Sequence, residues 1–160
     1  MGAAIPKKVR PSPKFSIMAV RYFEQQVNSK LKNKRRLSSF LQSLIQKHRD
    51  DLKTIDLTYI FCNDNYLVEI NQKFLNHDTL TDIITFDLSE NEDDLVSEIY
   101  ISIDRIKENA EKFKVQYEQE LHRVIFHGAL HLCGFKDKTS IAKEKMRQQE
   151  DSCLQQYFAT

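Results

Sequence analysis

The sequence predicts an α/β (α+β) fold, a single layered domain in which a small mixed β-sheet of about four strands packs with about five helices. Its 160 residues are a typical length for one domain with one hydrophobic core. A hydrophobic content of 41%, with only three glycines and three prolines, indicates dense secondary structure rather than long linkers. Segments with helical spacing of apolar residues alternate along the chain with short strand-like segments.

The N-terminal residues differ from the rest in composition. Residues 1–17 contain all three prolines and four basic side chains, with little apolar periodicity. We therefore expect residues 1–17 to form a flexible extension and residues 18–160 to form a single domain, which begins with a short strand over residues 19–23.

The first half of this domain is predicted to continue with a helix, a strand and a second helix. The helix, near residues 37–48, follows from apolar residues at helical spacing, which are Leu37, Phe40, Leu41, Leu44 and Ile45. Residues 54–61 alternate apolar and polar side chains, as a half-buried strand does. Asn63 then offers an N-cap for a helix that extends to about residue 74.

The second half is predicted to contain two strands followed by helices. The predicted elements are strands over residues 81–88 and 96–103 and helices over residues 104–113, 118–133 and 140–157. An acidic turn joins the two strands, and strands joined in this way are expected to be antiparallel neighbours.

Composition also bears on the class of protein. Three scattered cysteines without Cys-x-x-Cys spacing fit the reduced thiols of a cytoplasmic protein rather than a disulfide framework. No apolar run approaches the ~20 residues of a membrane span. The net charge is +1, yet residues 1–36 contain ten Lys and Arg side chains and one acidic one. This basic N-terminal segment either contacts phosphates or is a solvated surface, and both interpretations stay open.

The chemistry centres on the segment from His127 to Asp137. His127 and His131 stand four residues apart, so on a helix their imidazoles share one face. Gly134 suits the left-handed residue that ends a helix, and such a turn can bring Asp137 back toward the same point. Two nitrogens and one oxygen suit Zn²⁺ with a fourth position open for water. The alternative is a capped amphipathic helix without a metal.

The ligand spacing matches the metzincin zinc site, in which glutamate follows the first histidine as general base. Here Gly128 occupies that place, so the usual peptidase base is missing. On a helical wheel Gly128 falls in the core stripe, where a glycine allows a neighbouring element to approach closely. His127 and His131 lie at the border of that stripe, which suits the floor of a cleft. His122 and His48 are expected to be surface residues.

The run HGALHLCGFKD and the upstream TDIITFD resemble the YbeY family of bacterial rRNA maturation factors. The family pattern H-G-x-L-H-L-x-G-Y/F-x-H matches from His127 to Phe135 and departs at Asp137, where the third ligand is commonly histidine. The resemblance implies a zinc-dependent, single-strand-specific endoribonuclease with one Zn²⁺ ion. It also implies rRNA and the ribosomal small subunit as partners, with roles at the 16S 3′ end and in ribosome quality control. Residues 18–160 would then form one metal-binding catalytic domain.

Without a glutamate at position 128, a general base must come from elsewhere in the fold. Asp82 is the first candidate because the resembling family places this strand beside the metal cleft, although Asp82 could instead cap its strand through local backbone bonds. His77, in the preceding turn, either supplies a proton or is a surface residue.

The candidate substrate-binding residues are Lys73, Lys136 and Lys138. Lys136 and Lys138 flank Asp137, where they either contact a substrate phosphate or solvate the loop. The resemblance also aligns Leu75 with an arginine of the family that is implicated in ribonuclease activity. A leucine cannot bind phosphate, so Lys73 or His77 would take over or cleavage would be weaker.

Three functions compete on these residues. The first is the zinc-dependent endoribonuclease, and the second is a non-catalytic ribosome-assembly factor with a structural metal. The third is a metzincin-like metallopeptidase, which the ligand spacing favours and Gly128 disfavours.

Overall fold

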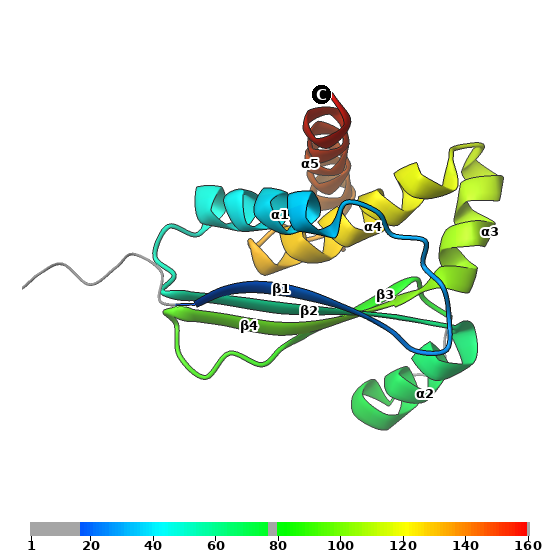
Figure 1. The fold of residues 1–160 in the computed structure, drawn as a ribbon, viewed down its shortest axis with the longest axis horizontal. Coiled ribbons are helices and arrows are strands. Elements are labelled where there is room, and N and C mark those ends of the chain that lie inside the picture. Colours follow the sequence, from blue (N-terminus) through cyan, green and yellow to red (C-terminus); the bar gives the residue numbers. More distant parts are fainter. Residues whose placement is uncertain (1–16, 77–79, 160) are drawn as a thin grey trace, which may run out of the picture.

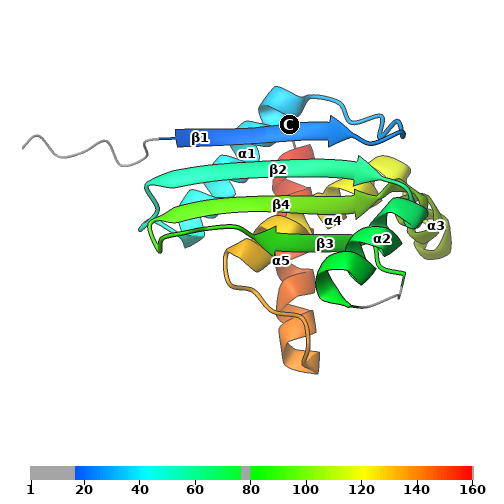
Figure 2. The same ribbon diagram turned by 90° about the horizontal axis from the view of Figure 1, so that it is seen from below.

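The computed structural model describes residues 17–76 and 80–159, which form a four-stranded sheet with helices on both faces (Figure 1). The strands are β1 (Ile17–Glu24), β2 (Thr54–Cys62), β3 (Ile83–Asp87) and β4 (Asp94–Ser102). Their order across the sheet is β1-β2-β4-β3 (Figure 2). The pairs β1–β2 and β2–β4 are parallel, whereas β3 pairs antiparallel with β4 and forms one edge.

The helices divide unequally between the two faces. On one face lie α1 (Lys34–His48), α3 (Ile103–Phe113) and α4 (Tyr117–Leu132), and α5 (Ser140–Phe158) crosses over α4 as an outer layer (Figure 1). The other face carries α2 (Asp64–Leu75) at one end of the sheet. Among the described residues, no helix combines the length and apolar character that a bilayer span requires.

The main core lies between the sheet and the helix pair α1 and α4. In β2 and β4 every second side chain points into it, and those side chains are Ile55, Leu57, Tyr59, Phe61, Leu95, Ser97, Ile99 and Ile101. The hydroxyl of Tyr59, which is fully buried, donates to the carbonyl oxygen of Ile125 in α4 at 2.9 Å. This bond satisfies the buried hydroxyl and ties the metal-motif helix to the centre of the sheet.

At Gly128, α4 packs closely against the sheet. A Cβ atom there would lie 2.9 Å from Cδ1 of Ile83 and 3.2 Å from Cγ2 of Ile99. The prediction that this glycine permits close approach is therefore confirmed. Because Ile83 belongs to β3, the approach brings the C-terminal half of α4 against the edge strand.

The predicted fold class is confirmed, because the described residues form a single mixed sheet of four strands and five helices. The antiparallel pairing of the two strands in the second half is confirmed as well. Element ends differ by one to two residues at most positions, and the helix predicted from residue 37 begins at Lys34. The strand predicted over residues 81–88 is limited to Ile83–Asp87. The first strand begins at Ile17, the last residue of the predicted extension, and residues 1–16 lie outside the described part of the chain.

The surface location expected for two histidines is wrong. His122 is 1% exposed, and its ring stacks on that of Tyr157 with 5.1 Å between centroids. His48 is half-buried and packs edge-on against Phe135, with its Nε2 atom buried. In both cases a neighbouring segment covers the side of the helix that a helical wheel assigns to solvent. For His122 that segment is α5.

Candidate metal centre

The two histidines of the motif project from the last turns of α4. Their rings are 4.5 Å apart between centroids and nearly perpendicular, at 87°. The helix ends at Leu132, and two residues later Gly134 has a φ of 99°, the left-handed conformation that glycine adopts most readily. The Phe135 amide donates back to the Leu130 carbonyl at 3.1 Å, which closes the turn. The chain therefore reverses direction immediately after the second imidazole.

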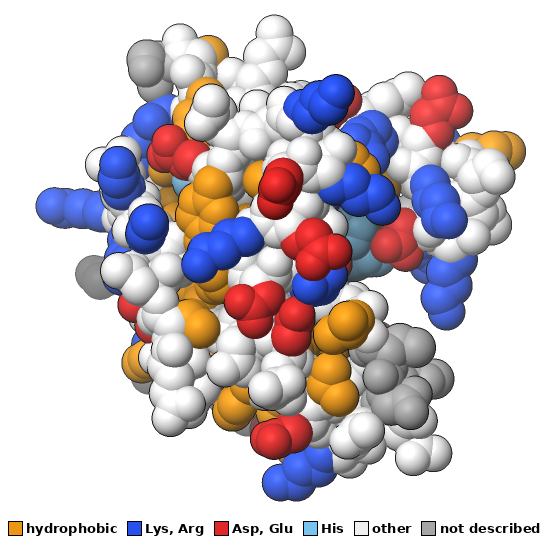
Figure 3. All heavy atoms as spheres, turned by 90° about the vertical axis from the view of Figure 1, so that its right-hand side faces the viewer, with side chains coloured by type: hydrophobic (Ala, Val, Ile, Leu, Met, Phe, Trp, Pro, Cys, Tyr) orange, Lys and Arg blue, Asp and Glu red, His pale blue; other side chains and the backbone are white. Residues whose placement is uncertain are grey.

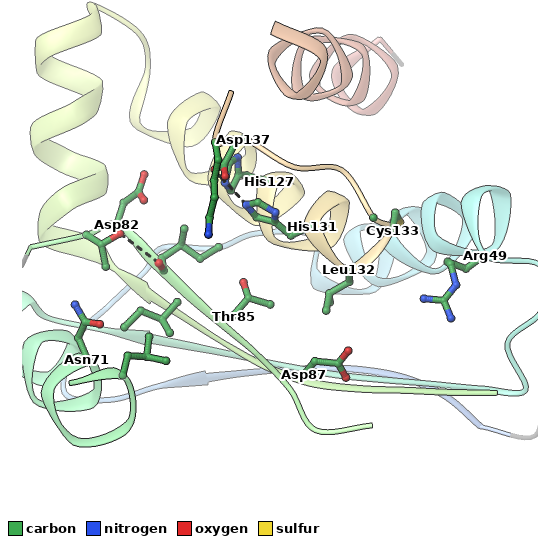
Figure 4. Close-up of a pocket in the computed structure, with 16 residues that line it drawn as sticks. Arg49, Asn71, Asp82, Thr85, Asp87, His127, His131, Leu132, Cys133 and Asp137 are labelled. Carbon is green, nitrogen blue, oxygen red and sulfur yellow. Dashed lines mark hydrogen bonds and ion pairs between the residues drawn. The ribbon is translucent and has the colours of Figure 1, made fainter. Parts of the chain in front are cut away.

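This reversal brings Asp137 over the imidazoles (Figure 4). Its Oδ2 atom lies 3.2 Å from Nε2 of His131 and 3.3 Å from Nε2 of His127. One potential ligand atom from each residue lies within 4.8 Å of the others. The side chains are 17%, 30% and 39% exposed for His127, His131 and Asp137. The three predicted ligands thus form one group that could hold a metal ion at a site reachable from solvent.

The hydrogen bonds on the far side of each ring determine what the near side can do. Nδ1 of His131 lies 2.9 Å from the Phe135 carbonyl oxygen, and Nδ1 of His127 lies 2.7 Å from Oε2 of Glu150. Both partners are acceptors, so each Nδ1 donates to its partner, and in the neutral form of a ring with this tautomer Nε2 presents a lone pair. Two such lone pairs and a carboxylate oxygen that face one point can bind a cation, which is either a proton shared with Asp137 or a metal ion. The donor set therefore fits a metal ion.

The chemistry of these donors narrows the choice of metal. Two imidazole nitrogens and one carboxylate oxygen are the ligands of catalytic zinc sites, which keep a position free for water or substrate. No cysteine joins the group. Burial raises the pKa of the neighbouring Cys133 thiol to about 12, which disfavours its thiolate form.

A buried charged network behind His127 was not foreseen. Glu150 of α5 contacts Nη1 of Arg123 at 3.0 Å, and Nε of Arg123 lies 2.9 Å from Oε2 of Glu120. Burial alone would raise the pKa of the Glu150 carboxyl, but the bonds from His127 and Arg123 outweigh it and the pKa is lowered. A signal was present in the sequence. Glu150 interrupts the apolar stripe of α5, which consists of Met146, Cys153, Leu154 and Tyr157.

The metal group lies on the wall of an open cleft of about 890 Å³. The segment from Thr81 to Thr85 lines the opposite wall, Asn71 and Leu75 of α2 line one end, and Arg49 and Asp87 line the other (Figure 4). In the space-filling view, histidine side chains lie at the bottom of a hollow between basic, acidic and apolar groups (Figure 3). No sequence pattern had pointed to Arg49, which also pairs with Asp51.

Of the candidate catalytic and substrate-binding residues, some line the cleft and others do not. Asp82 lines the cleft, and burial raises the pKa of its carboxyl despite the opposing charges of Arg123 and His127. Lys138 lines the cleft too. Lys136 and Lys73 do not, and the ammonium of Lys73 lies over the ring of Phe74, 5.4 Å from its centroid. His77 falls outside the described residues.

Comparison with known proteins adds the family context. The model of the family described as endoribonuclease YbeY matches residues 21–158. The endoribonuclease YbeY of Flavobacterium psychrophilum is 57% identical over 99 residues, which are 62% of this chain and 70% of that protein. The endoribonuclease YbeY of Cytophaga hutchinsonii is 43% identical over 133 residues, 83% of this chain and 92% of that protein.

A solved structure is similar as well. The solution structure of a protein from Thermotoga maritima has a TM-score of 0.58 and 26% sequence identity to this chain. The match covers 88% of this chain and 90% of the Thermotoga maritima chain.

We expect His127→Ala and His131→Ala to abolish tight zinc binding, because each removes one of three protein ligands. Asp137→Ala should weaken zinc binding, since it leaves two imidazoles. Competition with a chromophoric chelator measures all three affinities. The matched controls are His48→Gln and His122→Phe, which remove imidazoles outside the group and should bind zinc like the parent. Parent-like affinity in His131→Ala would show that the metal binds elsewhere.

Proposed function

This chain belongs to the endoribonuclease YbeY family, and on that basis we propose that it is a zinc-dependent, single-strand-specific endoribonuclease that acts in rRNA maturation. Its substrate would be rRNA of the ribosomal small subunit, with 16S 3′-end maturation and ribosome quality control as its roles in the cytoplasm. The observation that carries the proposal is the convergence of three acceptor atoms, from His127, His131 and Asp137, in an open cleft.

In this proposal the three side chains hold one Zn²⁺ ion. Bound zinc lowers the pKa of a coordinated water toward neutrality and polarises a phosphoryl oxygen. The protein contributes the fixed orientation of the imidazoles, through Phe135 and Glu150, and a recessed position for the reacting phosphate. A flexible single strand can bend into such a recess more readily than a rigid duplex.

Asp82 is proposed as the proton acceptor. It lies one residue before β3 and lines the same cleft as both imidazoles. A carboxyl whose pKa is raised by burial accepts a proton more readily than a solvated one does. Its backbone carbonyl accepts from the Ser102 amide at 3.0 Å, which anchors the segment to β4.

Lys138 is proposed as a contact for the substrate phosphate, since this exposed ammonium lies on the rim of the cleft beside Asp137. Lys73 and Lys136 are weaker candidates, because neither lines the cleft. A longer RNA segment that extends beyond the cleft could reach both residues.

One residue bears on each of the two alternative functions, the non-catalytic assembly factor and the metallopeptidase. Leu75 lines the cleft at the place where the family resemblance puts an arginine, which favours the non-catalytic assembly factor. Gly128 disfavours the metallopeptidase, since a side chain at that position would meet Ile83 and Ile99 in the core instead of entering the cleft.

Incubation of zinc-loaded protein with single-stranded RNA, duplex RNA and casein separates the three functions. We expect cleavage of the single strand alone, and its loss after chelation of the metal or in His131→Ala. Zinc restored to the chelated protein should recover the activity. Casein cleavage would identify a peptidase. Specific binding to the small subunit without cleavage of any substrate would identify the assembly factor.

Asp82→Asn should lower kcat by roughly 10²–10⁴-fold if the carboxylate accepts the proton. The base works only when deprotonated, so the parent rate should fall as the pH falls through the pKa of Asp82. Because that pKa is raised, the acidic limb should lie above the range of an ordinary aspartate, about 4. The limb should vanish in Asp82→Asn while zinc affinity is retained. Asp87→Asn, at the other end of the cleft, is the matched control, and equal effects of both substitutions would contradict the assignment.

Leu75→Arg should increase cleavage by roughly tenfold or more, because it places a guanidinium where charge develops on the phosphate. Single-turnover kinetics with a short single-stranded RNA measures the effect. Leu80→Arg adds the same charge at an exposed position outside the cleft lining and should leave the rate near that of the parent. An equal gain in both variants would attribute the effect to net charge alone.

A further inference from the structure

A continuous buried chain of charged groups connects α4 to α5 directly behind the metal group. Glu150 of α5 accepts from Nδ1 of His127 at 2.7 Å through Oε2 and from Nη1 of Arg123 at 3.0 Å through Oε1. Arg123 also donates to both carboxylate oxygens of Glu120. The side chains of Glu120 and Glu150 are 2% and 3% exposed.

The charges of this chain do not cancel. Two carboxylates share one guanidinium, so one negative charge remains in a water-poor site, and an uncompensated buried charge is unfavourable. The chain of contacts ends at the ring of His127, whose Nε2 atom faces Asp137. A cation at Nε2 of His127 lies where it offsets the excess.

We propose that Glu150 is a positioning residue for the metal centre. It holds His127 in the tautomer with the proton on Nδ1 and in the orientation that presents Nε2, and Arg123 holds Glu150 in place. His131 has a different support, the Phe135 carbonyl of its own turn. The docking of α5 is thereby part of the metal centre, although α5 supplies none of the three ligands. The proposal rests on the metal site of the proposed function and not on RNA cleavage.

A purely structural role would make the same contacts, as a salt bridge that fastens α5 to α4. The two roles differ in what happens to the imidazole. A fastening salt bridge leaves zinc affinity unchanged once the protein is folded. A positioning carboxylate alters both zinc affinity and the His127 tautomer when it is replaced.

Glu150→Gln tests the proposal because it preserves size but removes the charge and offers His127 a donor as well as an acceptor. We expect zinc affinity, measured by chelator competition, to fall roughly 10–100-fold. In the metal-free protein at alkaline pH, ¹⁵N NMR should show His127 protonated on Nδ1 in the parent. The variant should show a substantial Nε2-protonated population. Glu144→Gln, at an exposed position of the same helix, should match the parent in both measurements.

Two results would overturn the proposal. One is a folded Glu150→Gln protein with parental zinc affinity and an unchanged tautomer. The other is a parent whose metal-free His127 carries its proton on Nε2, and this measurement requires no variant to fold. Neither readout involves RNA, so a failure here is distinguishable from a failure of the proposed nuclease activity.

Discussion

The close packing of α4 against the sheet at Gly128 is the constraint on which the rest of the site depends. It places one side of the helix against Ile83 and Ile99 and leaves the adjacent side, with His127 and His131, facing the cleft. A larger residue at that position would overpack the core, which costs about 1–3 kcal/mol in typical cases. It would also push the imidazoles away from the segment that carries Asp82. The absence of a peptidase-type glutamate is thus a packing requirement as well as a chemical difference.

Much of the fold and the ligand group was predictable because the relevant signals are local. The helical spacing of the apolar residues, the turn at Gly134 and the interval from His127 to Asp137 all act within a few residues of one another. The misplacement of His122 has the opposite origin. A single helix contains no information about a second layer, and here α5 buries the side of α4 that a wheel assigns to water.

The parts of the site that were missed come from distant segments. Arg49 follows α1 and reaches the cleft only through the tertiary fold, so no spacing rule could have paired it with the metal motif. The role of Glu150 could in principle have been predicted from the sequence, since an acidic side chain within an apolar stripe requires a buried partner. Its partner, however, was identifiable only from the packing of α5 on α4. Asp82 is an intermediate case. The strand that follows it was predicted from the sequence pattern, but its position beside the metal cleft was expected only from the family resemblance.

The charged chain behind His127 also bears on how the site assembles during folding. The ligands and their supports, from Arg123 to Glu150, come from two consecutive helices and the turn between them. Few residues have to be looped out to bring these groups together, so the loop-closure entropy of forming the centre is small. The parts of the cleft that contain Asp82 and Leu75 precede these two helices in the sequence and are joined to them through the sheet. The centre is therefore a short-range unit, whereas the cleft around it is a product of long-range topology.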